Sequence, residues 1–235
     1  MESTHFGQRP MDIPPDTSLI ETMHASPSGD IALLDLHLDR LQRSANRLQF
    51  NVPGRDHIRR HVLDHLTSHP IEGRHQRVRL LLDRNGQLRI ESYDLPPLSG
   101  TPLVAIADTK LNSQAPLLQH KTTHRPWYAE AMPWLNTHPD FFDLIYLNEK
   151  DEVCEGSRSN IYLFRDGAWV TPPLECGLLG GVMRRQILED GKAVEGVITV
   201  SDLAAADVRL RLSNGLRGWF DVQLSDRPGI QDRNS

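Results

Sequence analysis

Apolar residues recur with helical or strand periods along the first half of the chain and predict two helices and several short strands. Over 36–49, apolar side chains return at three- and four-residue steps with arginines on the other faces, which is typical of an amphipathic helix. A second helix is predicted over 56–66. Asn85-Gly86 between two apolar runs predicts a hairpin, because both residues tolerate positive φ. The predicted strands are 18–23, 31–34 (which forms a hairpin with the first through a turn at 27–30), 77–82, 88–93 and 103–107.

The second half combines strand-like runs with glycine-rich turns. The stretch 112–120 lacks sustained periodicity, so we interpret it as a connection between two domains, 1–111 and 121–235. A glycine-rich turn at 177–181 leads into a predicted helix over 182–189. The other predicted elements are helices at 128–134 and 202–206 and strands at 143–147, 160–164, 168–170, 197–200 and 208–212.

Composition and charge narrow the class of protein. The 235 residues are 38% hydrophobic and 24% charged, as in ordinary soluble globular proteins. A formal net charge of −5 argues against nucleic-acid binding, which depends on an excess of lysine and arginine. Cys154 and Cys176 are too few for a disulfide framework, and the first twenty residues hold no long apolar run. We therefore expect a cytoplasmic protein with no metal, no membrane segment and no nucleic-acid partner, whose ligand is a small molecule.

Three histidines recur one turn apart on the second predicted helix, at His57, His61 and His65. Four-residue spacing of histidines can bind a metal ion. No matching cluster of carboxylates or cysteines accompanies them in the sequence. A solvated helix face is therefore the favoured interpretation.

Candidate chemistry centres on Lys121 and Glu155. The sequence has no G-x-S-x-G, H-E-x-x-H or G-x-G-x-x-G motif, which weakens hydrolase and dinucleotide-binding interpretations. Lysine is scarce, and Lys121 stands among histidines and threonines, although taken alone it would more often be a surface cation. Glu155 precedes a glycine and small polar residues at the start of an apolar strand. In this setting the carboxylate of Glu155 can point into a pocket. Taken alone, an acid at such a position more often belongs to an ordinary turn.

Five segments of the chain stand out as motifs: H-L-D-R-L at 37–41, H-K-T-T-H-R at 120–125, E-G-S-R-S-N at 155–160, G-L-L-G-G-V-M-R at 177–184 and S-N-G-L-R-G at 213–218. In this order and rough spacing they resemble the class IV aminotransferases, and the resemblance covers about 18–222 of the chain. Within that family, the H-K-T-T-H-R and S-N-x-L-R-G blocks are similar to those of the aminodeoxychorismate lyases.

The resemblance implies an α+β fold, that of the fold type IV pyridoxal phosphate enzymes, with a smaller N-terminal domain, a larger C-terminal domain and the cofactor between them. It also implies a homodimer. Lys121 then corresponds to the lysine that binds pyridoxal phosphate as a Schiff base, which requires a lowered pKa of its amine. Glu155 corresponds to the acid that pairs with the pyridinium nitrogen. Arg40 corresponds to the arginine that binds the phosphate, because its planar fork suits a dianion.

Further site residues follow from the same resemblance. The turn at 180–181 would place Val182 and Met183 at a helix N-terminus, where backbone N–H groups favour phosphate. Many family members have a hydroxyl where Met183 stands, and many have a glycine-rich segment before the first strand that this chain lacks. The other cofactor-binding candidates are Asn160, Ser213 and Asn214, of which the last two fit a simple strand-end turn equally well. Substrate carboxylates need cationic partners, and the substrate-binding candidates are Arg79, Arg158, Arg217 and, near the cofactor, Thr22.

The activity that the resemblance implies is the elimination of pyruvate from aminodeoxychorismate to give para-aminobenzoate, a step toward folate. A class IV transaminase acting on branched-chain or D-amino acids would share the cofactor residues and stays open as an alternative. So does a non-catalytic partner subunit that has kept the fold, although Lys121, Glu155 and Arg40 argue against it. An aminodeoxychorismate synthase component is a candidate partner.

Overall fold

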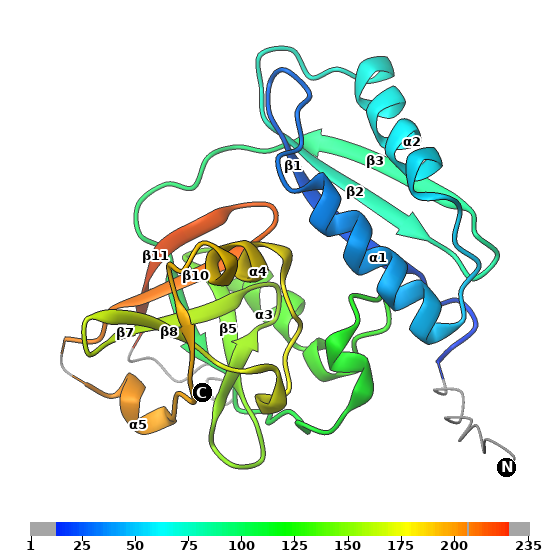
Figure 1. Ribbon diagram of the computed structural model, residues 1–235. Coiled ribbons are helices and arrows are strands. Elements are labelled where there is room, and N and C mark those ends of the chain that lie inside the picture. The colour runs from blue at the N-terminus through cyan, green and yellow to red at the C-terminus, as the bar shows by residue number, and fades with distance from the viewer. Residues whose placement is uncertain (1–12, 206, 226–235) are drawn as a thin grey trace, which may run out of the picture.

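A computed structural model describes residues 13–205 and 207–225, which fold around two β-sheets (Figure 1). The elements of the smaller part are β1 (Leu19–Ala25), α1 (Leu34–Leu48), α2 (Arg55–Ser68), β2 (Gln76–Leu82) and β3 (Leu88–Asp94). The three strands pair in the order β1-β2-β3 and are antiparallel throughout. Because burial alternates along β1 and β2, Met23, Val78 and Leu80 share one face of the sheet. Both helices cover that face and complete the first hydrophobic core.

The predicted hairpin between β2 and β3 is confirmed. Gly86 adopts a φ of 91°, and Oδ1 of Asp83 accepts hydrogen bonds from the backbone N–H groups of Asn85 and Gln87 at 2.9 and 2.8 Å. The hairpin predicted from 18–23 into 31–34 is wrong. The turn after β1 leads directly into α1, because Leu34 already belongs to the apolar stripe that continues with Leu38 and packs in the core.

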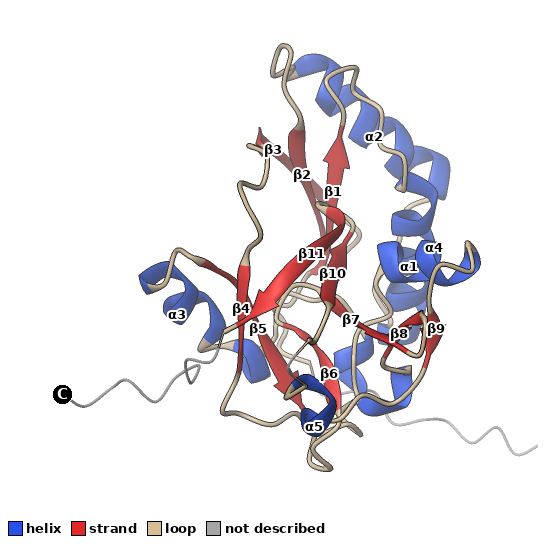
Figure 2. Ribbon diagram, turned by 90° about the vertical axis from the view of Figure 1, so that its left-hand side faces the viewer, coloured by secondary structure: helices blue, strands red, loops and turns tan. Residues whose placement is uncertain are grey.

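The larger sheet has eight strands and mixed direction. Its order is β6-β5-β4-β11-β10-β7-β8-β9, with β4 parallel to both β5 and β11 and β9 parallel to β8. Its helices pack at the edges and on the faces (Figure 2). The elements are β4 (Leu103–Ile106), α3 (Ala131–Thr137), β5 (Phe141–Leu147), β6 (Val153–Gly156), β7 (Asn160–Arg165), β8 (Ala168–Thr171), α4 (Val182–Glu189), β9 (Val194–Glu195), α5 (Val200–Leu203), β10 (Leu210–Asn214) and β11 (Gly218–Leu224).

Some elements of the second half differ from the prediction. The strand predicted at 197–200 is wrong, because Thr199 and Asp202 form a capping box that begins α5. β6 and β11 were not predicted, since both contain glycine and polar residues that interrupt the apolar pattern. The helix predicted at 182–189 is confirmed as α4.

The chain passes from the smaller to the larger sheet over 95–102, between β3 and β4. β4 therefore belongs to the larger sheet, although it precedes the domain connection predicted at 112–120. That boundary itself stays a prediction. In both views the smaller sheet stands over one end of the larger one (Figures 1 and 2).

The rings of His57 and His61 on α2 lie 4.4 Å apart and are tilted, whereas His65 stacks at 4.5 Å on His69, which follows the helix. Among the described residues, no group of three or more histidines, cysteines or acids could hold a metal ion. None of the helices in 13–205 and 207–225 has the length and apolar character needed to cross a membrane.

Candidate active site

A cavity of about 270 Å³ lies where the smaller sheet, α1 and the larger sheet come together, and Lys121 lines it. Residues that are far apart in the sequence meet there. The sequence-predicted residues that line the cavity are Thr22, Arg40, Lys121, Glu155, Arg158, Asn160, Val182, Ser213 and Asn214.

Backbone hydrogen bonds to β1 and to the residue before it fix the backbone position of Lys121. Its carbonyl accepts a 2.9 Å hydrogen bond from the N–H of Ile20, and the N–H of Thr123 donates to the carbonyl of Ser18 at 2.9 Å. Burial, together with the nearby charges of Arg125 and Arg40, lowers the pKa of the Lys121 amine from 10.5 to about 7. A substantial fraction of the amine is therefore neutral near pH 7, as a nucleophile or base must be.

Glu155, at the end of β6, is buried in the same cavity and is held from two sides. Tyr128 donates a 2.7 Å hydrogen bond to Oε1, and Nδ2 of Asn160 lies 3.5 Å from Oε2. Burial raises the pKa of Glu155 from 4.5 to about 7, although Arg125 and the hydrogen bond from Tyr128 act against that rise. The carboxyl is thus poised to hold or share a proton with a basic group placed beside it.

A buried carboxylate on β5 shapes the loop that follows Glu155. Oδ1 of Asp143 accepts a 2.6 Å hydrogen bond from Ser157, and Oδ2 accepts a 2.5 Å hydrogen bond from Ser159. A side chain at Gly156 would overlap Asp143 and come within 2.6 Å of the Ser159 hydroxyl. The E-G-S-R-S-N segment therefore needs a glycine here, since the acid behind it occupies the space of a Cβ atom.

Arg40 reaches the cavity from α1 and is paired with a buried acid on β1. Its Nε donates to Oε1 of Glu21 at 2.8 Å, its Nη2 donates to Oε2, and Nδ1 of His37 lies 2.6 Å from Oε2. Burial alone would raise the pKa of Glu21, but Arg40 and His37 hold it at about 2. Glu21 thereby fixes one edge of the guanidinium and leaves Nη1 of Arg40 outside this pairing.

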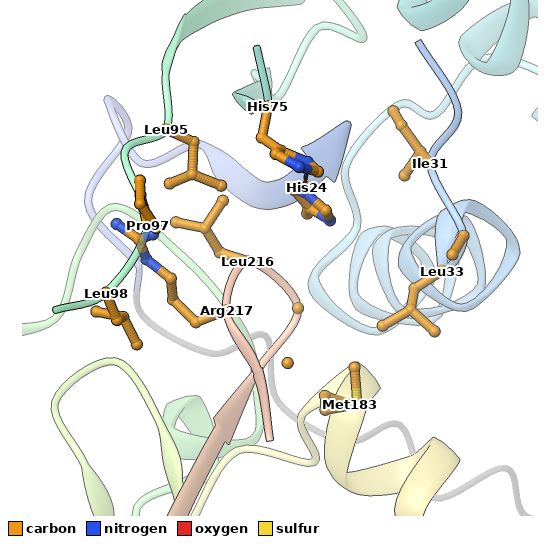
Figure 3. Close-up of a pocket in the computed structure, with 13 residues that line it drawn as sticks. His24, Ile31, Leu33, His75, Leu95, Pro97, Leu98, Met183, Leu216 and Arg217 are labelled. Atoms are coloured by element: carbon orange, nitrogen blue, oxygen red, sulfur yellow. Dashed lines mark hydrogen bonds between the residues drawn. The ribbon is translucent and has the colours of Figure 1, made fainter. Parts of the chain in front are cut away.

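The first turn of α4 borders the cavity, and the backbone before it fits closely. Nδ2 of Asn160 donates a 2.8 Å hydrogen bond to the carbonyl of Leu179, and a Cβ atom at Gly181 would overlap Oδ1 of the same amide. Val182 lines the cavity, whereas the side chain of Met183 lines a neighbouring one (Figure 3). Close packing of Gly181 on Asn160 places the N-terminus of α4, with its unpaired N–H groups, at the cavity.

The turn between β10 and β11 forms another wall. The hydroxyl of Ser213 lies 2.8 Å from the hydroxyl of the buried Tyr162. Oδ1 of Asn214 accepts hydrogen bonds from the N–H groups of Leu216 and Arg217 at 3.0 and 2.7 Å. The Asn214 side chain thus stabilises the turn. The backbone of the turn is part of the wall of the cavity.

The predicted substrate residues are not all gathered in one cavity. Thr22 and Arg158 line the cavity of Lys121, whereas Arg217 lines the two adjoining cavities. Arg79 pairs with Thr22 across β1 and β2 but lines none of the three. Its neighbour on the same sheet face, Arg77, lines the Lys121 cavity instead.

Several residues of the site were missed in the sequence. The signal for Glu21 was an acid on the buried side of a strand, between Leu19 and Met23, which demands a cationic partner. Similarly, Asp143 stands among six apolar residues in β5. Arg125 ends the H-K-T-T-H-R block, but neither it nor Tyr128 carries a pattern that points to Glu155, and only the fold brings them to that acid.

Comparison with known proteins gives the family. A family model for class IV aminotransferases matches residues 18–224. The chain belongs to the class IV aminotransferase family, and it is therefore a pyridoxal-phosphate-dependent enzyme. The resemblance seen in the sequence is confirmed at this level.

Two curated relatives and one solved structure illustrate the similarity. A Schizosaccharomyces pombe protein, provisionally named aminodeoxychorismate lyase, is 30% identical over 170 residues, 71% of this chain and 72% of that protein. The aminodeoxychorismate lyase of Bacillus subtilis is 27% identical over 178 residues, 69% of this chain and 60% of the relative. The crystal structure of a Mesorhizobium loti protein, provisionally named an amino-acid aminotransferase, has a TM-score of 0.80 at 34% identity and covers 89% of this chain and 100% of that one. The predicted α+β architecture of fold type IV enzymes is thus confirmed.

The residues around the cavity fit pyridoxal phosphate. Lys121 offers a partly neutral amine, and the carboxyl of Glu155 is buried in the same cavity. Arg40 and the N-terminus of α4 supply a cation and backbone donors for a phosphate. A Cβ atom would overlap Asn160 at Gly181, and His37 and Val182 at Gly215, so the backbone at both glycines packs directly against residues beside the cavity.

Proposed function

We propose that this enzyme is an aminodeoxychorismate lyase, which releases pyruvate from aminodeoxychorismate and leaves para-aminobenzoate. The observation that carries the proposal is the name shared by the S. pombe and B. subtilis relatives, together with a cavity that retains the lysine, acid and arginine that cofactor chemistry needs. The H-K-T-T-H-R and S-N-x-L-R-G blocks line or adjoin this cavity. The reaction is an elimination without net oxidation, so it needs no second substrate.

The proposed roles follow from the contacts. Lys121 binds the cofactor covalently, Glu155 pairs with its pyridinium nitrogen, and Arg40 with the backbone of Val182 and Met183 holds its phosphate. Bound pyridoxal phosphate supplies an electron sink for breaking a C–H bond beside an amine. Asn160 holds the turn before α4 and lies beside Glu155, while Ser213 and Asn214 shape the opposite wall.

Lys121 is also the proposed proton carrier. Its Nζ takes the proton from the ring carbon that bears the substrate amine, which a pKa of about 7 allows near neutral pH. Loss of that proton lets the C–O bond to the enolpyruvyl group break, and the departing enolate takes up a proton on carbon to become pyruvate. Aromatisation of the ring drives the step, so the main task of the protein is to orient the C–H bond toward Nζ.

A transaminase acting on an amino acid is the alternative. It is favoured by the M. loti structure, because that protein is 34% identical and is named for amino-acid transfer. Both activities use the same cofactor contacts, so Lys121, Glu155 and Arg40 do not separate them. The separation must come from the substrate.

The deciding experiment supplies aminodeoxychorismate to the purified holoenzyme without any keto acid. We expect pyruvate and para-aminobenzoate in equal amounts, and no product from Lys121→Ala. If pyruvate does not form while an amino group passes from an amino acid to a keto acid, the lyase assignment is wrong. A Lys121→Ala protein that keeps the visible absorbance of lysine-bound cofactor would contradict the role of Lys121 itself.

The proposal extends to assembly and location. Family enzymes commonly form homodimers, and we propose that this chain does so in the cytoplasm, where its two free buried cysteines stay reduced. Light scattering during size-exclusion chromatography tests the dimer. Docking on an aminodeoxychorismate synthase component is the further partner proposed, and co-elution with that component tests it.

A further inference from the structure

Three arginines from separate segments meet beside the Lys121 cavity. Arg77 lies on β2, Arg158 in the loop between β6 and β7, and Arg217 in the turn between β10 and β11. All three line a second cavity of about 810 Å³, and Arg77 and Arg158 also line the cavity of Lys121. Arg217 faces a third cavity of about 540 Å³ as well (Figure 3). Leu216 borders all three cavities, so the arginines lie around cavities that adjoin one another at this residue.

The positive charge of this arginine cluster (Arg77, Arg158 and Arg217) is not neutralised within the described part of the chain. Arg77 lies over the ring of Tyr93, with 4.8 Å from Cζ to the centroid, and forms no ion pair there. Arg158 lies over the ring of Phe142 at 4.5 Å and donates to a backbone carbonyl. Arg217 likewise donates only to a backbone carbonyl, that of Pro96.

The carboxylates that line the second cavity form no ion pair with the arginine cluster. Asp94 and Asp140 line the second cavity, but Asp94 is paired with Arg74 at 3.1 Å, and Asp140 forms no ion pair with any described residue. Burial, with repulsion from Arg158 and Arg77, lowers the pKa of Arg217 below its ordinary value. Like charges gathered without a counter-charge cost free energy, which an anionic ligand would recover.

One side chain ties two of the arginines together. Asn214 donates from Nδ2 to the carbonyl of Arg158 at 3.2 Å, while its Oδ1 accepts from the N–H of Arg217 at 2.7 Å. These two hydrogen bonds therefore hold the backbone of Arg158 next to that of Arg217. Asn214 acts as a positioning residue for the cluster.

We propose that Arg77, Arg158 and Arg217 bind the two carboxylates of a dicarboxylate substrate, so that the substrate amine points inward to Lys121. The inference rests on the proposed function and deepens it, because aminodeoxychorismate carries one carboxylate on its ring and one on its enolpyruvyl group. Arginine forks bind carboxylates in a bidentate way, and three forks suffice for two such groups. The cluster selects dicarboxylates over substrates with a single acid.

Binding of a ligand that cannot react tests the cluster apart from catalysis. Chorismate has both carboxylates but no amine, and benzoate has one carboxylate, so calorimetric titration of the holoenzyme with each compares two acids with one. We expect wild type to bind chorismate more tightly than benzoate. Arg158→Gln and Arg217→Gln should each raise the dissociation constant of chorismate about tenfold, and Arg217→Lys should raise it less.

The matched control is Arg89→Gln, which removes an exposed arginine of the smaller sheet that pairs with Glu91 at 2.6 Å. It should leave chorismate binding unchanged, and the visible absorbance of bound cofactor shows that each variant is folded. If chorismate binds no better than benzoate, or if the cluster variants bind it like wild type, the inference is overturned even when pyruvate is released. If pyruvate is not released but the cluster variants still lose chorismate binding, the proposed function fails and the carboxylate site stands.

Discussion

The hydroxyl of Tyr128 donates a 2.7 Å hydrogen bond to Oε1 of Glu155, and both side chains are buried. This bond favours the ionised carboxyl, whereas burial favours the protonated one and raises the pKa of Glu155 to about 7. Tyr128 follows Lys121 closely in the sequence. The segment that carries the lysine therefore also affects the pKa of Glu155. The balance at Glu155 therefore depends on one phenol that the sequence alone did not single out.

Tyr128→Phe removes this hydrogen bond and should weaken cofactor binding. The pKa of Glu155 would rise, so less of the carboxyl would be ionised to pair with the pyridinium nitrogen. We expect the dissociation constant of pyridoxal phosphate to rise roughly tenfold, with a larger effect below pH 7 than above it. Fluorescence titration of the apoprotein measures it, with the exposed Tyr93→Phe as control. Equal affinity at every pH would mean that Tyr128 contributes packing alone.

Gly181→Ala should be far more damaging than Gly180→Ala, although the two glycines are adjacent. A Cβ atom at Gly181 would overlap Oδ1 of Asn160, whereas one at Gly180 meets only Leu174 at an ordinary 3.6 Å. Displacing Asn160 breaks its hydrogen bond to Leu179, and we expect a loss of about 1–3 kcal/mol in the free energy of unfolding. Urea denaturation measures both variants. Equal stability of the two would contradict close packing at this turn.

The sequence predicted those parts of the fold in which the local pattern decides the structure. The stripe of α1, the Asn85-Gly86 hairpin and the glycine turn before α4 are of this kind, because each follows from spacing or from a residue that tolerates its backbone conformation. β11 escaped prediction, since glycine and polar residues interrupt its apolar pattern and one of its two neighbours in the sheet, β4, is distant in the sequence.

The same distinction applies to the site. Lys121, Glu155 and Arg40 stand in short motifs and could be predicted by resemblance. Their partners could not, because Glu21 reaches Arg40 across 19 positions and Tyr128 reaches Glu155 across 27. Arg79 and Arg77 differ only in their place along β2, and the sequence does not say which of them borders the cavity.

Arg40→Met should weaken the binding of pyridoxal phosphate but not that of pyridoxal, which lacks the phosphate. Charge-assisted hydrogen bonds are worth about 1.5–3 kcal/mol, so the preference for the phosphorylated form should fall by roughly ten- to a hundredfold. The variant leaves Glu21 buried without its cation, so Glu21→Gln/Arg40→Met is measured alongside it. Arg43→Met, on an exposed position of α1, is the control. An unchanged preference in both Arg40 variants would place the phosphate elsewhere.

The opposed pKa shifts of Lys121 and Glu155 predict a minimum near pH 7 in their contribution to apoprotein stability. Glu155 has a folded pKa of about 7 against 4.5 ordinarily, so its stabilising contribution is complete below 4.5 and is lost as the pH rises to 7. Lys121 has a folded pKa of about 7 against 10.5, so its contribution is complete above 10.5 and is lost as the pH falls to 7.

Urea denaturation of the apoprotein from about pH 5 to about pH 10 tests this minimum, because both shifted groups titrate within that range. The free energy of unfolding of wild type is compared with that of Lys121→Met/Glu155→Gln, so that titrations shared by the two proteins cancel. We expect the stability of wild type relative to the double variant to be lowest near pH 7. Glu155→Gln alone should abolish the change below pH 7, and Lys121→Met alone should abolish the change above it. A difference that does not vary with pH would mean that neither group is buried as the structure has it.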